Sequence, residues 1–475
     1  MRRHHGKRRG FIYYTRWLLI LALITVAYNY LSKIYAVSNY IDADKIYASS
    51  VLKDRNFSGK VKEISTTDGI KAYFLEEHSI PIVSVSFLFK NSGYAHENEK
   101  SLGLTHILAD MLLSGAGEYD LLQFKDLCEE NGIKIGFDVD ADDFSGYLQF
   151  PVANQKTGVK LFKSVMNSPL FEEEYLALSK SQLQTILRLR RENPEAILSD
   201  KFSETIFNSH PYARAKFGEN KTISALKADD LRNFMHKNFA KDNLIIGIVG
   251  DIDEENAEIL LKDMFGMLPE KSKTVALPKA DLQFGGHEYF LPRDNSAQAI
   301  TQFVTHGTTR QSADFYPLYI ANYIFGGSGL NSRISGIIRE KEGLTYGIYT
   351  YLSIFDAVAL LKGSFSATPD NFIRAKELLL SEWQKMAEKG ISVAELKAAK
   401  DSLLASNNLR FASTGGIADM LVAIQKENLG IDFFEKRNGY IEAVTLEEVN
   451  AAAKKYFSIT PDFVIIGAGE KEDKQ

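Results

Sequence analysis

Two residues that could bind a metal ion lie one helical turn apart in an apolar segment. His106 and Asp110 occupy positions i and i+4 of LGLTHILADMLLSG (102–115), which its apolar pattern and terminal glycine predict to be a helix. Such a pair can bind a metal weakly, but a catalytic zinc site needs three protein ligands and a general base. Ala109, between them, cannot accept a proton from water. We therefore predict no catalytic metal site at this helix, with weak binding by His106 and Asp110 as the alternative.

A second candidate pair, Arg339 and Tyr346, lies in the segment REKEGLTY. An arginine supplies a permanent charge and several hydrogen-bond donors, and a phenol can donate to a developing oxyanion. By itself, however, the segment favours a surface arginine that pairs with Glu340 or Glu342 and a tyrosine packed in a strand. The adjacent glycine-rich stretch lacks the GxxxxGK[ST] pattern, so it is not a phosphate-binding loop.

The acidic run FDVDADDFSG (137–146) resembles a calcium loop only at first sight. Asp138, Asp140 and Asp142 have the spacing of calcium ligands, but Asp143 stands where an EF-hand needs glycine and the twelfth position is a glutamine. The alternation instead predicts a strand with one acidic face in solvent.

These residues lie in a chain that alternates predicted strands and helices. Residues 61–77 and 133–150 read as hairpins, and 228–251 resembles 446–470, each an acidic helix start followed by a buried strand ending in glycine and an acid. A repeat of that length indicates domain duplication. We predict an N-terminal domain (51–268), a linker (269–284), a C-terminal domain (285–470) and a charged tail (471–475).

Charge is distributed unevenly along the 475 residues, which carry 56 Lys+Arg and 61 Asp+Glu for a net charge of −5. The first 16 residues hold six Lys/Arg and no acid, so 50 basic and 61 acidic residues remain, a balance of −11. We expect such an acidic body not to bind nucleic acid. The single cysteine, Cys128, excludes an intramolecular disulfide and a multi-cysteine zinc ribbon.

An uncharged run, Trp17 to Leu31, follows the basic tail. Flanking aromatic residues extend it toward the roughly 20 residues that span a bilayer. We predict that residues 1–50 comprise a cytoplasmic tail, a transmembrane or signal segment and a tether. Residues 17–37 would make a single pass through the inner (cytoplasmic) membrane, with the body exported to the periplasm or another extracytoplasmic side. Cleavage at Ala36-Val37-Ser38, giving a secreted protein, is the alternative.

Three segments, in order, carry a family resemblance: GYAHENEKSLGLTHILADMLLSGAG (93–117), the HPY…VGD segment (210–252) and GLNSRISGIIREKEGLTYGIYTYL (329–352). Together they resemble the insulinase and mitochondrial processing peptidase family of zinc peptidases, over roughly residues 60–470. The resemblance implies an α+β fold with two homologous domains. Each domain is a mostly antiparallel sheet packed with helices, and together they form half of a clam-shell peptidase chamber.

Family members that cleave peptides carry an inverted zinc motif, HxxEH, and a distant glutamate ligand. At the matching positions this sequence has His106, Ala109 and Asp110, so the base and the second histidine are replaced. The third ligand would lie on the helix around SQLQTILRLRR (181–191), which contains no acid. The resemblance therefore implies a degenerate zinc motif, with no metal or other cofactor bound by this chain.

Arg339 and Tyr346 match an Arg/Tyr pair that, in the family, faces the zinc from the other half of the chamber and hydrogen-bonds the substrate. Some bacterial members work as two chains, one with the zinc motif and one with only this pair. The resemblance implies a chain inactive alone, in which Arg339 and Tyr346 position a peptide and stabilise the oxyanion. Zn²⁺ would come from a homologous partner in a heterodimeric metallopeptidase. A non-enzymatic scaffold or assembly subunit, and a self-contained metallopeptidase with a divergent site, remain alternatives.

Overall fold

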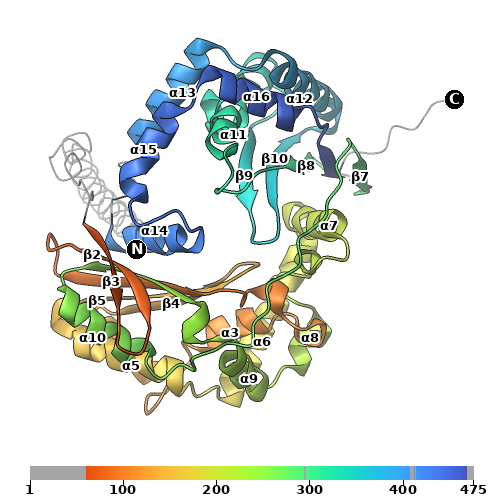
Figure 1. Cartoon of the computed structure of the whole chain (residues 1–475). Helices are drawn as coiled ribbons and strands as arrows, with labels where there is room; N and C mark the ends of the chain where they lie inside the picture. Colours follow the sequence, from red (N-terminus) through yellow and green to blue (C-terminus); the bar gives the residue numbers. More distant parts are fainter. Residues whose placement is uncertain (1–59, 294–295, 407–410, 412, 468–475) are drawn as a thin grey trace, which may run out of the picture. The chain divides into compact units, whose positions relative to one another are not determined.

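The computed structural model of the protein describes residues 60–293, 296–406, 411 and 413–467 (Figure 1). The predicted tail, membrane or signal segment and charged C-terminus lie outside these residues. Within the described part of the chain, no helix combines the length and the apolar character needed to cross a membrane. The described residues comprise most of the two predicted domains and the linker that joins them.

The first sheet is built by the N-terminal half of the body. Its strand order is β1-β2-β6-β3-β5-β4, and all pairs are antiparallel except β2 with β6. The predicted hairpins at 61–77 and 133–150 are confirmed as β1–β2 and β4–β5, and Gly69 (φ +83°) turns the first of them. The strands are β1 (Val61–Ser65), β2 (Lys71–Glu76), β3 (Ile82–Phe89), β4 (Lys134–Val139), β5 (Phe144–Pro151) and β6 (Leu244–Gly250).

The second sheet repeats this topology in the C-terminal half. Its order is β7-β11-β8-β10-β9, and again one pair, β7 with β11, is parallel. Without β1, the strands of the two sheets correspond one to one, so two mostly antiparallel sheets are confirmed. The strands are β7 (Glu288–Leu291), β8 (Ala299–His306), β9 (Ile348–Ile354), β10 (Ala359–Ala367) and β11 (Asp462–Ile466).

Helices follow the strands in both halves. Those of the N-terminal half are α3 (Leu104–Met111), α4 (Leu121–Glu130), α5 (Gln155–Asn167), α6 (Glu173–Glu192), α7 (Pro194–Phe207), α8 (Asn220–Ala225), α9 (Ala228–Asn238) and α10 (Glu254–Phe265). Those of the C-terminal half are α11 (Phe315–Asn322), α12 (Pro369–Lys389), α13 (Val393–Ala405), α14 (Thr414–Lys426), α15 (Phe433–Ala443) and α16 (Leu446–Phe457). The segments recognised as a repeat in the sequence are α9–β6 and α16–β11.

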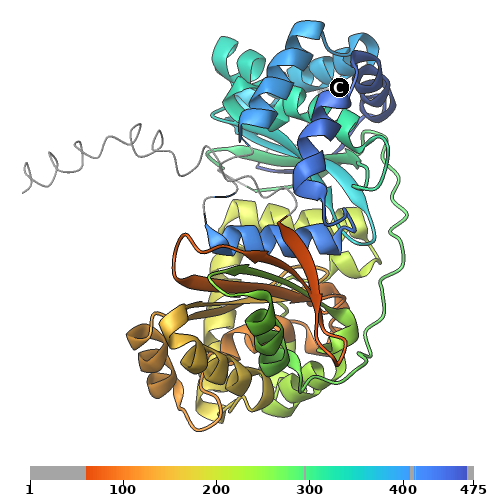
Figure 2. The same ribbon diagram turned by 60° about the vertical axis from the view of Figure 1, so that its left-hand side comes forward.

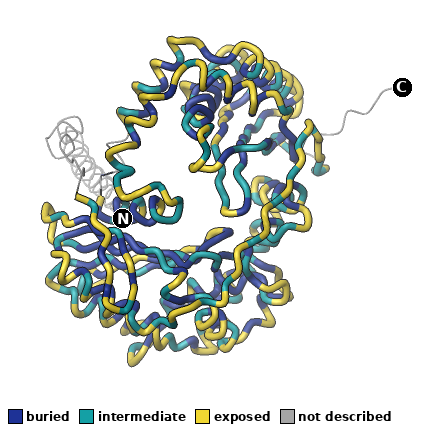
Figure 3. Tube along the Cα trace, viewed as in Figure 1, coloured by how far each residue is buried: buried dark blue, intermediate teal, exposed yellow. Residues whose placement is uncertain are grey.

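Both faces of the first sheet are buried, but by helices from different halves of the chain. Phe74 and Ile248 join the core formed with the helices of their own half, whereas their neighbours Leu75 and Val249 pack against α14. This alternation follows from the two-residue period of a strand, and it explains why β6 reads as an uninterrupted apolar run. Figure 2 shows α14 lying across the strands of the first sheet, and Figure 3 shows the buried strands beneath it.

The second sheet receives a helix from the first half in the same way. Val304 and Val464 pack with Leu198 and Phe202 of α7, while Phe303, one residue before Val304, faces the core of its own half. Each sheet is thus covered on one face by its own helices and on the other by a helix of the opposite half. We call this arrangement the helix exchange.

The acidic run around residue 140 contradicts the prediction of a fully solvated face. Asp138 and Asp140 are exposed, but Asp142 and Asp143 are buried. Their carboxylates can be buried because donors from elsewhere in the body meet them. Asp142 accepts hydrogen bonds from the Tyr212 hydroxyl (2.5 Å) and from the backbone N–H of residue 356 (3.0 Å), and Asp143 forms an ion pair with the lysine that ends α14.

Candidate functional site

The helix that carries the degenerate zinc motif, α3, begins at a buried carboxylate. Gly103 adopts φ +94° just before the helix, and Glu97 accepts hydrogen bonds from the Gly103 N–H (2.7 Å), the Thr105 N–H (2.6 Å) and the Thr105 hydroxyl (2.6 Å). Burial raises the pKa of Glu97 to about 7, although these hydrogen bonds oppose the rise. Sequence reasoning missed Glu97, because nothing in the polar run HENEK distinguishes one acid as buried.

His106, Ala109 and Asp110 do not form a metal site in this helix. The His106 ring is half-buried, and its centroid lies 4.7 Å from that of the Phe217 ring. Its Nδ1 makes no hydrogen bond with the described residues. Burial lowers the pKa of His106 to about 4, and the nearby Lys216 adds to this effect. Ala109 packs against the core, whereas the Asp110 side chain is exposed. The histidine is therefore neutral, and its i+4 neighbour points into solvent.

Two cations lie at Phe217, the ring that His106 contacts. Helix α6, which packs against α3, contains no acid over residues 181–191. Its Arg190 instead stacks on Phe217 with the guanidinium carbon 4.7 Å from the ring centroid, and the Lys216 nitrogen lies 5.2 Å from the same centroid. No cluster of three or more His, Cys, Asp or Glu suited to a metal occurs among the residues that the structure describes. The residues present do not fit a zinc ion.

Arg339 and Tyr346 are brought together through the main chain. Arg339 lies in a π-helical turn, η8 (Ser335–Lys341), and its Nε donates to the Tyr346 carbonyl oxygen (3.1 Å). Its Nη1 is 3.9 Å from the Glu340 carboxylate, so the predicted surface pairing with Glu340 is present but long. The Tyr346 side chain is 87% exposed and is not packed in a strand. The Tyr346 side chain is therefore exposed to solvent, while the Arg339 guanidinium holds the main-chain carbonyl of the same residue.

The segment before Tyr346 is anchored to its neighbouring strand. The Thr345 hydroxyl donates to the Ser366 carbonyl of β10 (2.6 Å). The same hydroxyl oxygen accepts a hydrogen bond from the Gly347 N–H (3.1 Å). A second π-helical turn, η6 (Tyr323–Gly327), precedes the glycine-rich loop, and π-helical turns occur frequently at functional sites. Gly326 lies so close to β9 that an added Cβ would sit 2.4 Å from the Thr350 hydroxyl oxygen. These contacts anchor the backbone at Tyr346, although the side chain of this residue is exposed.

Two further tyrosines extend this exposed surface along β9, the edge strand of the second sheet. Tyr349 and Tyr351 are 49% and 41% exposed, and their rings stack with centroids 6.1 Å apart. An edge strand offers unpaired backbone N–H and C=O groups to which an extended peptide can add. Sequence reasoning missed this feature, although the alternation in YGIYTYL indicated it.

Comparisons with known protein families match both halves of the chain. Residues 74–219 match the insulinase family (peptidase family M16), and residues 225–403 match the peptidase M16 inactive domain. The chain belongs to the M16 family of peptidases and their homologues.

Particular relatives are similar over most of the chain. The Helicobacter pylori protein named non-peptidase homolog YmxG is 23% identical over 406 residues, which are 85% of this chain and 93% of that protein. The peptidase M16 inactive domain from Pseudomonas fluorescens matches with a TM-score of 0.80 and 24% identity, over 86% of this chain and 98% of that one. The periplasmic protease PqqL from Escherichia coli matches with a TM-score of 0.75 and 16% identity, over 87% of this chain but 46% of its own.

Proposed function

We propose that this chain is the zinc-less, substrate-positioning subunit of a two-chain metallopeptidase that cleaves peptides. In this role the chain is inactive alone, and a homologous partner with an intact HxxEH motif supplies the metal, the attacking water and the general base. Arg339 and Tyr346 of this chain contact the substrate.

The observation that carries the proposal is the contrast between the two candidate sites. At the first, His106 has no second ligand on its helix face, because Ala109 has none to offer and Asp110 is exposed, and Lys216 lies close enough to affect its charge. At the second, Tyr346 is 87% exposed, and Arg339 donates a hydrogen bond to its main-chain carbonyl. A structural tyrosine would be expected to bury its ring, because an exposed ring contributes little to stability. An exposed phenol on an anchored backbone is suited to donating to a bound carbonyl oxygen.

The exposed edge of β9 supports a peptide as the substrate. A peptide paired with this edge would run past Tyr349 and Tyr351 toward Tyr346, with its backbone bonded to the strand and its side chains against the rings. Arg339 uses Nε for the Tyr346 carbonyl, so its two Nη groups retain N–H donors for the substrate.

The likeness to PqqL supports a partner of the same fold. This chain matches 46% of the chain of PqqL, a periplasmic protease, so that protease contains about twice the matched length. We propose that a second chain supplies the other half of an equivalent assembly. We propose export to the periplasm or another extracytoplasmic side by the same analogy and by the N-terminal basic-then-apolar pattern, with residues 17–37 as the membrane anchor.

Reconstitution tests this function. The full chain, purified in detergent, is mixed with the HxxEH-bearing homologue from the same genome, and cleavage of a fluorogenic peptide library is measured. We expect activity only in the mixture. Tyr346→Phe should lower turnover by about 100-fold, as expected for the loss of one oxyanion donor, while leaving co-elution of the two chains on gel filtration unchanged. Full activity of the homologue without this chain would overturn the proposal.

Matched variants separate this function from the alternatives. Tyr440→Phe, at an exposed tyrosine on α15, and Arg374→Gln, a surface arginine on α12, should leave turnover unchanged. Arg339→Ala should assemble but lose catalysis. If Arg339→Ala assembles and the complex works normally, the chain is a scaffold or assembly subunit instead.

A further inference from the structure

A lysine without an acidic partner lies on the face of the second sheet toward α7. Lys362 of β10 pairs in register with Tyr351 of β9, so its side chain is on the same face of the sheet as those of Tyr349 and Tyr351. Helix α7 covers β8 and β11 on this face, whereas the two tyrosines of β9 are 49% and 41% exposed. Lys362 lies between the covered and the open part of this face, and it is partly exposed.

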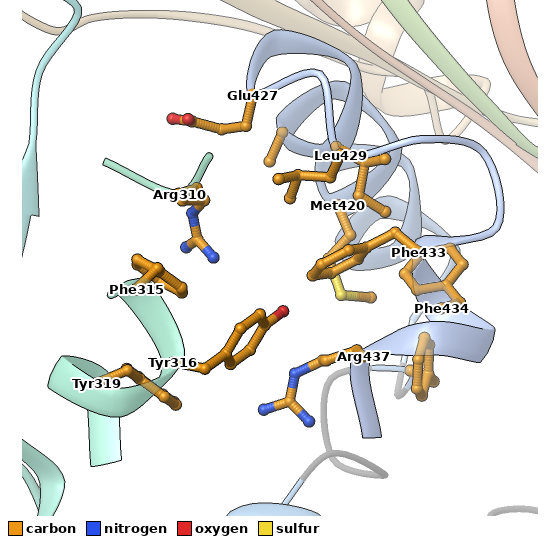
Figure 4. Close-up of a pocket in the computed structure, with 13 residues that line it drawn as sticks. Arg310, Phe315, Tyr316, Tyr319, Met420, Glu427, Leu429, Phe433, Phe434 and Arg437 are labelled. Carbon is orange, nitrogen blue, oxygen red and sulfur yellow. The ribbon is translucent and has the colours of Figure 1, made fainter. Parts of the chain in front are cut away.

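The ammonium group of Lys362 contacts an aromatic ring but no acceptor. Its nitrogen lies 4.1 Å from the centroid of the Phe202 ring of α7, and it makes no hydrogen bond or ion pair with the residues that the structure describes. Arg437, which is 7% exposed in the wall of the pocket between α11, α14 and α15 (Figure 4), instead donates to the Asn438 side chain (3.2 Å). The N–H donors of Lys362 are therefore available to a ligand.

The environment of Lys362 differs from that of an ordinary surface lysine. A lysine whose stem is buried but whose head group extends into water keeps an ordinary pKa. Burial lowers the pKa of Lys362 to about 8, and no acidic group among the described residues offsets this effect. A cation in such a partly desolvated position is stabilised when a carboxylate pairs with it. The position is therefore suited to an anion that a ligand supplies.

The register of β9 indicates which part of a peptide would carry that anion. Tyr351 is the fourth of the seven residues of β9, so a peptide that pairs along this edge continues past it on both sides. A side chain of the peptide, and not its terminal carboxylate, then lies beside Tyr351. The added strand would lie about 4.8 Å beyond β9 and about 10 Å from β10, a distance that a glutamate and a lysine side chain together can span.

We propose that Lys362 selects peptides with an acidic side chain, by pairing with the carboxylate of a peptide strand added to β9. The carboxylate lies beside the Tyr351 ring, and the Phe202 ring supports the ammonium group from the other side. This inference rests on the function proposed above, because it takes the ligand of the β9 edge to be a peptide.

Calorimetric titration of the full chain in detergent tests the inference without the partner. The probes are three octapeptides of alternating threonine and valine, capped at both ends, with glutamate, glutamine or lysine at the fifth position. The glutamate peptide should bind at least about tenfold more tightly than the glutamine peptide, and the lysine peptide should bind more weakly still. Equal affinities for the glutamate and glutamine peptides, or no measurable binding of the glutamate peptide, would overturn the inference.

Variants locate the preference at Lys362. Lys362→Met should reduce the difference between the glutamate and glutamine peptides to less than about twofold, whereas Lys362→Arg, which keeps the charge, should retain most of it. Lys134→Met, at an exposed lysine on β4, the edge strand of the first sheet, is the matched control and should keep the full difference. Circular dichroism checks that each variant is folded. A tenfold difference that persists in Lys362→Met would refute the assignment.

The titrations need neither zinc nor cleavage, so they separate this inference from the proposed function. Failed reconstitution with the HxxEH-bearing homologue would contradict the proposed function and leave the measured preference for glutamate standing. Equal peptide affinities would contradict only the role of Lys362.

Discussion

Tyr212→Phe tests how much of the stability of the body depends on the contact around Asp142. The Tyr212 hydroxyl donates to the Asp142 carboxylate (2.5 Å) and accepts from the Ala357 N–H (3.1 Å), and its ring packs against Phe355 with centroids 4.9 Å apart. Phenylalanine keeps the ring and removes both hydrogen bonds. A hydrogen bond to a charged group contributes about 1.5–3 kcal/mol, and a buried N–H left without an acceptor adds about 1–3 kcal/mol. We expect the free energy of unfolding to fall by about 2.5–6 kcal/mol.

Urea unfolding of the full chain in detergent measures this effect through tryptophan fluorescence and far-UV circular dichroism. Asp142→Asn gives a double-mutant cycle with Tyr212→Phe, in which a coupling free energy above about 1 kcal/mol is expected for groups in direct contact. Tyr440→Phe, at a position 40% exposed, is the control and should change stability by less than about 0.5 kcal/mol.

The reasoning would be refuted if Tyr212→Phe unfolded at the same urea concentration and with the same slope as the wild type. That result would mean that water or a rearranged backbone replaces the hydroxyl without loss. A lower midpoint together with a zero coupling energy to Asp142→Asn would place the effect on the Ala357 N–H instead of the carboxylate.

Three further predictions concern the helix of the degenerate motif and the packing of α14. The folded-state pKa of Glu97 is about 7 against an ordinary 4.5, so its stabilising contribution is complete below about pH 4.5 and is lost as the pH rises through about 7. Glu97→Gln should therefore flatten the dependence of the free energy of unfolding on pH over that range, as measured by urea unfolding. An unchanged dependence on pH would contradict the assignment. The purified chain should contain no stoichiometric zinc by mass spectrometry of metals, whereas zinc that disappears in His106→Ala would support a self-contained site. Gly247→Ala should destabilise the body by about 1–3 kcal/mol, because the new Cβ would lie 2.4 Å from the Ala418 carbonyl of α14; an unchanged urea midpoint would show that α14 can shift freely.

Much of the fold could be predicted from the sequence because the signals are local. Hairpins are marked by alternation and by a turn at Gly69, and the repeat is visible because α9–β6 and α16–β11 keep the same polar start and apolar end. The continuous apolar run of β6 correctly indicated a strand buried on both faces. What covers the second face could not be predicted, because α14 comes from more than 160 residues further along the chain.

The sequence alone could suggest which residues form the candidate sites, but it could not predict what surrounds their side chains. The resemblance predicted a degenerate motif, since Ala109 stands at the position of the general base and Asp110 at that of the second histidine. The cations at Phe217, the ring that contacts His106, in contrast come from α6 and from the loop before α8, and only folding brings them together. The acidic run illustrates the same limit: Asp142 and Asp143 look like their exposed neighbours in the sequence, and their partners lie 70 or more residues away.

The helix exchange has a consequence for how this body can be divided. A fragment that ends after β6 would leave Leu75 and Val249 facing water, because the helix that covers them belongs to the other half. The complementary fragment would lose α7 and expose Val304 and Val464. Separately expressed halves should therefore aggregate, and should regain solubility only when produced together. We therefore expect the two duplicated units, which share these contacts, to unfold together as one cooperative unit.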